Sequence, residues 1–254
     1  MDEIGQRLIL HYIPYTDIRI PLGGLNLITV TSTLLVMVIL WALLILGARK
    51  MARIPGRGQL AVELLVGGFD SMVSSTLELK TREANRHYLP LISCLFMFIC
   101  LCNGIPLLPL PHLEEPTSDL NCTLALGAMV VLYSVYCGFK AHGVKGYLAG
   151  MCGPFWHHEG PLNAAAIMGK VMGAGFFFPL HVIETLSRVL SISCRLFGNI
   201  TGAAIVLTVL SALSYGLVLP LGLDAFFLVF ESAVQGFVFA MLSLIYIATS
   251  LQHE

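Results

Sequence analysis

A nearly continuous apolar stretch runs from residue 164 to residue 213 and limits the folds open to this chain. As a helix, these 50 residues would extend about 75 Å, more than twice the roughly 30 Å hydrocarbon core of a bilayer. The stretch must therefore break, at Gly173, Gly175 or Pro179, or cross a membrane at a steep tilt. Charged residues make up only 11% of the chain and hydrophobic residues 57%, whereas soluble domains have about 25% charged residues. Together these features indicate a polytopic membrane protein.

Four other apolar runs and one mixed segment complete the expected layout. The mixed segment alternates apolar and charged residues, which favours an amphipathic interfacial helix or hairpin over a full crossing. The fold class is all-α, with about five to six hydrophobic helices and the last two long. Residues 1–254 form a single membrane domain, with an N-terminal segment at 1–25, a first span at 26–48, the amphipathic segment at 59–87, spans at 88–106 and 120–139, and long helices at 164–213 and 223–251.

Turn residues and basic residues set the boundaries and the orientation. A Pro-rich stretch from Pro106 to Pro116 cannot continue a helix, and Thr117 or Ser118 can cap the next one, with Asp119 in its first turn. The third span is expected to end near Lys140, and the Gly-rich residues 141–163 to form a short broken segment. Basic residues number seven between 49 and 86 and none between 106 and 121, so the former segment is expected inside and the N-terminus outside.

One narrow polar stripe crosses the apolar residues 181–200. On a helical wheel of about 100° per residue, the strongly polar side chains fall within about 40° of Arg195, and Ser191 lies with them; they are His181, Glu184, Arg188 and Asn199. A charge at mid-bilayer costs about 2.5 to more than 10 kcal/mol, so such residues normally face a water-filled path or a partner. Snorkelling suits Arg195 poorly because apolar residues flank it. Arg188 could form an i,i+4 ion pair with Glu184, and a structural and a functional role both stay open for it.

A second polar stripe marks the last helix. Asp224, Glu231 and Tyr246 fall within about 40° of Gln235 on the same kind of wheel. Gln235 and Asn199 could be hydrogen-bonding residues of helix packing. Glu231 is harder to explain by packing, because a carboxylate in lipid needs a partner or a proton.

Other functional classes find little support in the sequence. Seven cysteines lie scattered in apolar stretches and are best interpreted as small buried hydrophobes, and His157 and His158 lack a third ligand at useful spacing. We therefore expect no metal and no cofactor. The chain has no basic tract for nucleic acid, and its first 25 residues lack the pattern of a cleaved signal peptide.

The motif RLFGN at residues 195–199 carries a family resemblance. The chain resembles subunit a of the F-type ATP synthase, the membrane stator beside the rotating ring of c subunits. Four segments are similar to that family in the right order and together extend over most of residues 26–250: the aromatic-rich span with its Asn103 and Pro109 (88–109), PTSDLN (116–121), SISCRLFGNITGA (191–203) and VQGFVFAMLSLIYI (234–247).

The resemblance implies a role for matching residues. Arg195 matches the arginine that faces the ring carboxylate, Asn199 lies one turn beyond it, and Gln235 matches the glutamine that approaches the arginine. It further implies two tilted helices packed against the c-ring, two offset proton half-channels, and no ATP chemistry on this chain. The implied partners are the ring of c subunits, other F0 stator and peripheral-stalk subunits, and the lipid bilayer.

The chain departs from the family at several positions. It has Ala204 and Leu228 where polar, often ionisable residues are usual, and Glu184 lies three residues nearer the arginine than the usual glutamate. Pro106 and Gly236 replace a customary glycine and alanine. The arginine position therefore carries over directly, whereas the proton route must differ.

These residues lead to a hypothesis with two competitors. Glu231, with Asp224 or His181, would relay protons on one side of Arg195, and Glu184 and Asp119 on the other. A proton-coupled secondary transporter would also place Arg, Glu and Asn in the membrane, but it predicts internal repeats that are not evident. A purely structural subunit predicts that Arg195 is dispensable. The cysteines and the irregular route favour the mitochondrial inner membrane, with the bacterial plasma membrane as the alternative.

Overall fold

The structure is a computed structural model of the 254-residue chain, and it describes residues 9–10, 25–49, 56–77, 86–105, 115–151, 164–213 and 218–251. Most of the N-terminal segment 1–25, the Pro-rich residues 106–114 and the second half of the Gly-rich segment, 152–163, lie outside the described residues. His157 and His158 belong to the last of these stretches.

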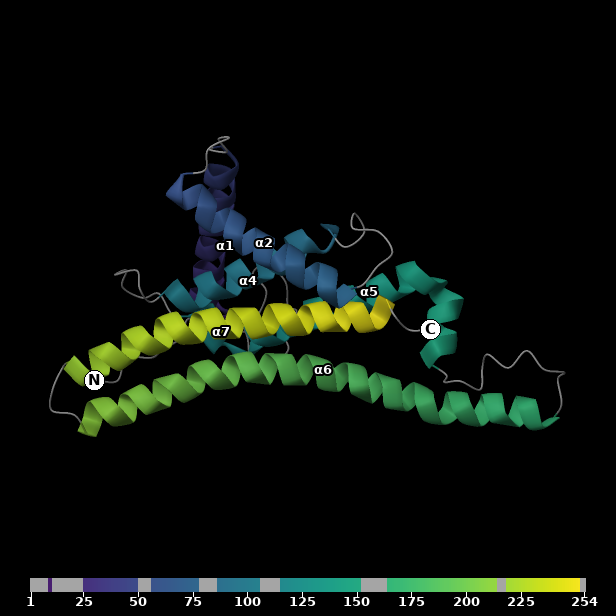
Figure 1. The fold of residues 1–254 in the computed structure, drawn as a ribbon. Helices are drawn as coiled ribbons and strands as arrows, with labels where there is room; N and C mark the ends of the chain where they lie inside the picture. Colours follow the sequence, from purple (N-terminus) through teal and green to yellow (C-terminus); the bar gives the residue numbers. More distant parts are fainter. Residues whose placement is uncertain are drawn as a thin grey trace. The chain divides into compact units, whose positions relative to one another are not determined.

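The described chain is helical apart from one short strand pairing (Figure 1). Strand β1 (Ile9–Leu10) pairs antiparallel with β2 (Leu25–Asn26). The helices are α1 (Leu27–Arg49), α2 (Arg57–Leu77), α4 (Leu89–Gly104), the 3-10 turn η2 (Pro116–Ser118), α5 (Leu120–Met151), α6 (Ala164–Leu213) and α7 (Val218–Leu251).

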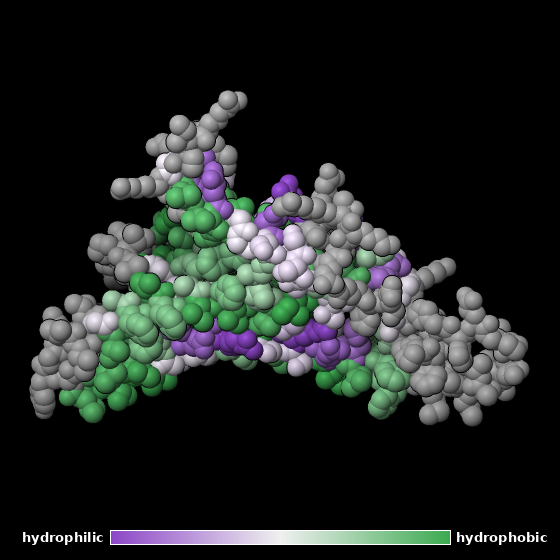
Figure 2. Space-filling view, viewed as in Figure 1, coloured by the Kyte–Doolittle hydropathy of each residue, from purple (hydrophilic) through white to green (hydrophobic). Residues whose placement is uncertain are grey.

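The predicted class, an all-α polytopic membrane protein, is confirmed. Four helices are long and apolar enough to cross a bilayer, over Leu27–Ile45, Leu120–Val144, Gly175–Leu213 and Gly222–Leu251, and Leu89–Gly104 is a shorter apolar helix. On the face shown in Figure 2, hydrophobic residues cover much of the described surface. Large exposed side chains such as Trp41 (67%) and Leu132 (67%) belong to these spans and would be costly in water.

The long apolar stretch forms one helix rather than two. Helix α6 runs through Pro179 without interruption over 50 residues. Proline removes one backbone hydrogen bond, but membrane helices tolerate it because neighbouring groups and small local adjustments satisfy the freed carbonyl. The expected break in residues 164–213 is therefore wrong. A helix of about 75 Å is longer than the bilayer core, so the other alternative, a tilted crossing, applies.

Contacts divide the chain into two compact units. The first unit comprises residues 1–123 and 194–240, and the second comprises residues 124–193 and 241–254. Helices α6 and α7 each contribute to both units.

In the first unit, α4 packs against α1, α2 and α7. Val36, Cys102 and Ile105 form a buried cluster, and the Phe69 and Phe96 rings lie 5.1 Å apart. These contacts explain why α2, although polar on one side, forms a helix with Phe69, Val73 and Leu77 buried along one face. Gly236 lets α7 approach α4 closely, because a Cβ there would lie 2.9 Å from Cys100 Sγ.

The second unit is held by close contacts of α5 with α6 and α7. A Cβ at Gly127 would lie 2.3 Å from Ser193 Oγ on α6. Ser134 Oγ donates to the Tyr246 carbonyl at 2.7 Å and lies 2.6 Å from Ser250 Oγ on α7. Helix packing in membranes relies on such small residues and hydroxyl hydrogen bonds.

Helix α5 continues past the expected end near Lys140. The helical conformation is interrupted only at Gly143, where φ is 71°, and a second helical piece follows to Met151. Glycine adopts this left-handed conformation without the steric cost of a Cβ, so the break falls there rather than at the lysine. The broken segment expected at 141–163 thus begins as a single kink.

Candidate functional site

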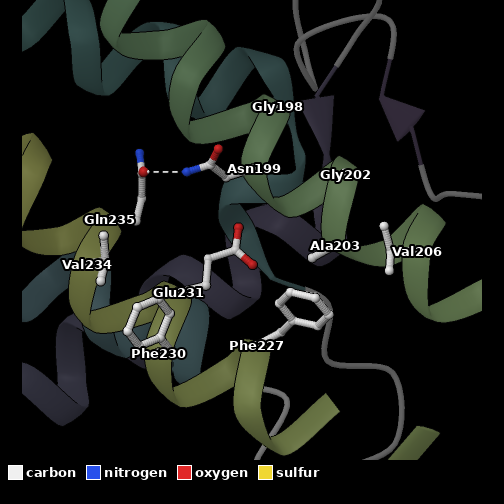
Figure 3. Close-up of a pocket in the computed structure, with 10 residues that line it drawn as sticks. All are labelled: Gly198, Asn199, Gly202, Ala203, Val206, Phe227, Phe230, Glu231, Val234 and Gln235. Atoms are coloured by element: carbon white, nitrogen blue, oxygen red, sulfur yellow. Dashed lines mark hydrogen bonds between the residues drawn. The ribbon is translucent and has the colours of Figure 1, made fainter. Parts of the chain in front are cut away.

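In the first unit, an amide side chain from the polar stripe of α6 contacts an amide side chain from the polar stripe of α7. Asn199 on α6 donates through Nδ2 to Gln235 Oε1 on α7, at 2.7 Å (Figure 3). Gln235 is buried at 2% exposure, whereas Asn199 is exposed, so this hydrogen bond joins the two helices at the border between packed and accessible surface.

Arg195 lies one turn before Asn199, on a face of α6 that the first unit leaves uncovered. Leu196 and Ile200, which lie about 100° and 140° from Arg195 around the helix, are buried, so the packed side of α6 is not the side of Arg195. Arg195 is exposed, and it forms no hydrogen bond or ion pair within the described part of the chain. A guanidinium always carries its charge, so an anion from outside the described residues is the natural partner for Arg195.

A cavity of about 400 Å³ opens beside the Asn199–Gln235 bond. Its lining comes from α6 and α7: Gly198, Asn199, Gly202, Ala203 and Val206, and Phe227, Phe230, Glu231, Val234 and Gln235 (Figure 3). No atom lies within 4 Å of a Cβ built at Gly198 or Gly202, so these glycines leave the space open. A water molecule takes up about 30 Å³, and the cavity has room for several.

Glu231 is the ionisable residue that lines this cavity. Its side chain extends from α7 toward α6, between Phe230 and Phe227 (Figure 3). One carboxylate oxygen, Oε1, is buried and forms no hydrogen bond with the described residues. A buried oxygen without a partner is costly unless water or a proton satisfies it. The arrangement suits a carboxyl group that exchanges protons with water in the cavity.

Two further carboxyl groups act electrostatically on this region. Asp224, two turns before Glu231 on α7, is exposed. Glu115, just before η2, was missed by sequence reasoning; burial, then Glu231, then Asp224 raise its pKa to about 7. The available signal was the acidic pair Glu114-Glu115 ahead of Pro116.

Asp119 serves as the N-cap of α5. Its carboxylate accepts hydrogen bonds from the Asn121 backbone N–H at 2.9 Å and from Thr29 Oγ1 at 3.4 Å. The expected cap at Thr117 or Ser118 is wrong, because Thr117 donates to Asn103 Oδ1 and Ser118 donates to the Glu115 carbonyl. Asp119 has the extended backbone of an N-cap, which puts its oxygen over the first turn.

The second unit gathers the other predicted residues. Arg188 donates to Glu184 Oε1 at 2.5 Å, and His181 Nδ1 lies 3.9 Å from Glu184 Oε2. The Arg188 guanidinium lies 5.3 Å from the centre of the Tyr246 ring. His181 thus lies beside Glu184 in the second unit, whereas Glu231 belongs to the first. In the described residues, no cluster of three or more His, Cys, Asp or Glu could hold a metal ion.

The family model for the ATP synthase A chain matches residues 29–248, which include every helix that contributes to these two groups. The chain belongs to the ATP synthase A chain family. It is 34% identical to an ATP synthase subunit a of Desulfosudis oleivorans over 87% of this chain and 86% of that protein. Subunits a of Aliarcobacter butzleri (35%; 91% and 92% covered) and Geotalea daltonii (34%; 93% and 92% covered) are similarly close.

The region matched by the family model includes Arg195, Asn199 and Gln235. The organisms of these relatives are bacterial, so the comparisons lend no support to a mitochondrial origin. What they support is a multi-pass membrane subunit a.

Proposed function

We propose that this chain is the F0 stator subunit that conducts protons to and from a ring of c subunits, and that Arg195 separates two offset half-channels. The observation that carries the proposal is the exposed guanidinium of Arg195, which has no anionic partner within the described chain and lies one turn from the Asn199–Gln235 bond. A ring carboxylate is the counter-ion that this position lacks.

Electrostatics explains what such an arginine does. A fixed cation favours the ionised form of a passing carboxylate and so promotes proton release from it. The same charge repels hydronium and opposes a direct leak between the half-channels. Lysine is a poorer substitute, because an ammonium in a desolvated site can lose its proton. Each proton that crosses 100 mV releases about 2.3 kcal/mol, and this work would turn the ring.

The relay residues divide between two groups in this proposal. Glu231 and Asp224 would carry protons in the half-channel that includes the α6–α7 cavity. Glu184 and His181 would carry protons in the other half-channel, along the earlier part of α6. Asp119 is proposed to order the start of α5, since its carboxylate already caps that helix. Arg188 is proposed to hold Glu184 in place.

Cross-linking tests whether the Arg195 face meets the ring. In a background without the native cysteines, Gly202→Cys lies about 20° from Arg195 on the helical wheel, and Ala204→Cys lies about 180° away. Both positions are exposed and small. We expect oxidation to join Gly202→Cys, but not Ala204→Cys, to a cysteine placed beside the ring carboxylate. Equal cross-linking at both positions, or none at Gly202→Cys, would contradict the proposed face.

The cavity role of Glu231 is tested by Glu231→Gln, which keeps the shape and removes the ionisable group. We expect proton-driven ATP synthesis to fall at least about tenfold, as for the loss of a positioned proton carrier. Glu63→Gln, on the exposed side of α2, is the control. Unchanged synthesis in Glu231→Gln would remove Glu231 from the proton path.

The proposed assembly also indicates which kind of membrane contains the protein. The proposed site is an energy-transducing membrane, either a bacterial plasma membrane, as in the bacterial relatives, or the mitochondrial inner membrane. A secondary transporter has no support from the family match, and it predicts substrate uptake without the ring. The peripheral stalk and other F0 subunits are the further partners of a stator.

A further inference from the structure

The cluster around Glu184 in the second unit includes Tyr147, a residue to which the proposed proton path gives no role. It follows the break at Gly143, where φ of 71° redirects the chain at the end of α5. The Tyr147 side chain is buried at 6% exposure and packs on Gly138, where a Cβ would lie 2.4 Å from the ring. Phe139 flanks it, with ring centres 4.5 Å apart.

This packing turns the Tyr147 ring toward His181 on α6. The two rings meet edge to face, with centres 6.4 Å apart and an interplanar angle of 85°. The His181 side chain is 15% exposed, whereas that of Glu184, one turn later, is 53% exposed. The imidazole is therefore confined between its own helix and Tyr147.

The two oxygens of Glu184 have different neighbours. Oε1 accepts a hydrogen bond from Arg188, and Oε2 faces His181 Nδ1 at 3.9 Å. A separation of 3.9 Å is too long for a direct hydrogen bond and suits one bridging water or a small rotation of the imidazole. Histidine is the side chain whose charge ordinarily changes between pH 5 and 8, so this pair can take up and release a proton.

We propose that Tyr147 is a positioning residue that holds His181 against Glu184, and that this pair is a proton-exchange station of the stator. The proposal rests on the proposed function, since it assigns the station to that proton path. In the exchange, the proton on His181 Nδ1 passes to water or to Glu184 Oε2 and leaves a neutral imidazole. The charged or titratable groups that the described residues place around the pair are Arg188 on α6, Tyr147 on α5 and, beyond Arg188, Tyr246 on α7.

The electrostatics around the Tyr147 hydroxyl agree with this placement. Burial raises its pKa first, Arg188 lowers it, and Glu184 raises it. The phenol therefore stays neutral at physiological pH and does not compete with His181 for the charge of Glu184.

The test compares the pH profile of ATP-driven proton pumping in vesicles that contain the assembled complex. Tyr147→Leu removes the ring, Tyr147→Phe keeps the ring without the hydroxyl, and Tyr136→Leu removes an exposed tyrosine of the same helix as a control. We expect Tyr147→Leu to move the profile midpoint to lower pH by about half to one unit, because the protonated imidazole loses its held carboxylate. Tyr147→Phe and Tyr136→Leu should keep the parent midpoint.

A double variant separates positioning from packing. In a His181→Gln background, Tyr147→Leu should cause no further shift, since the group that it positions is absent. A shift that persists in this background, an unchanged midpoint in Tyr147→Leu, or equal loss of pumping at every pH would overturn the proposal. These outcomes are independent of Arg195, whose replacement tests the stator role itself.

Discussion

Two arginines seven residues apart on the same stripe of α6 have opposite surroundings. Arg188 pairs with Glu184 and lies over the Tyr246 ring, whereas Arg195 is exposed and has no partner within the described residues. The i,i+4 spacing predicted the first pair, because it depends on one helix alone. The difference between the arginines depends on what other elements supply, and a helical wheel contains no such information.

Glu115 shows the same limit at a single residue. Its surroundings come from Glu231 and Asp224, more than 100 positions later in the chain. Local sequence therefore gave no reason to select Glu115. The Asn199–Gln235 pair was not predicted either, since 36 residues separate its members and the family resemblance implied only that Gln235 approaches the arginine.

The raised pKa of Glu115, about 7 instead of 4.5, predicts a pH effect on stability. The folded protein holds this proton more tightly than the unfolded chain, so the free energy of unfolding should fall as pH rises from about 4.5 to about 7. Glu115→Gln should flatten this part of the profile and raise the melting temperature above pH 7. Thermal melts of the purified complex across this pH range measure it, with Glu63→Gln as the control. A parent-like slope in Glu115→Gln would show that other groups cause it.

Among the helices, hydropathy predicted which helices exist better than it predicted where they end or which other helices they contact. The 164–213 helix was placed at its observed bounds because a long apolar run has few alternatives in a bilayer. The end of α5 was placed too early, because lysine permits helix and only Gly143 interrupts it. Which faces pack was not predictable, since lipid-facing and protein-facing residues are both apolar in a membrane.

The contact between α5 and α6 at Gly127 leads to a prediction about packing. Gly127→Ala would put a Cβ 2.8 Å from Ile192 Cγ2 and 3.2 Å from the Val189 carbonyl oxygen. Such overpacking should cost about 1–3 kcal/mol and lower the apparent melting temperature of the purified protein. Gly175→Ala on α6, with nothing within 4 Å, should have a neutral or slightly stabilising effect. Equal melting temperatures for the two variants would contradict this close contact.

At the scale of the whole molecule, composition and apolar run length were sufficient for the class. A chain with 11% charged residues and four candidate spans can satisfy its backbone in a bilayer only as helices or a closed barrel, and the runs are helix-length. The division into two units was not foreseen, because helices α6 and α7 each continue from one unit into the other. The proposed relay residues are divided between the two units, so the proposal requires both.

The central claim is that Arg195 separates two half-channels and faces the ring carboxylate. The most direct measurement is proton-driven ATP synthesis together with passive proton conductance in membranes that contain assembled Arg195→Ala complex. Arg86→Ala, which removes a cation paired with Asp70 at 3.7 Å, is the matched control. We expect Arg195→Ala to lose synthesis while the proton leak is kept or increased, and Arg86→Ala to retain synthesis. Unimpaired synthesis in assembled Arg195→Ala would contradict it.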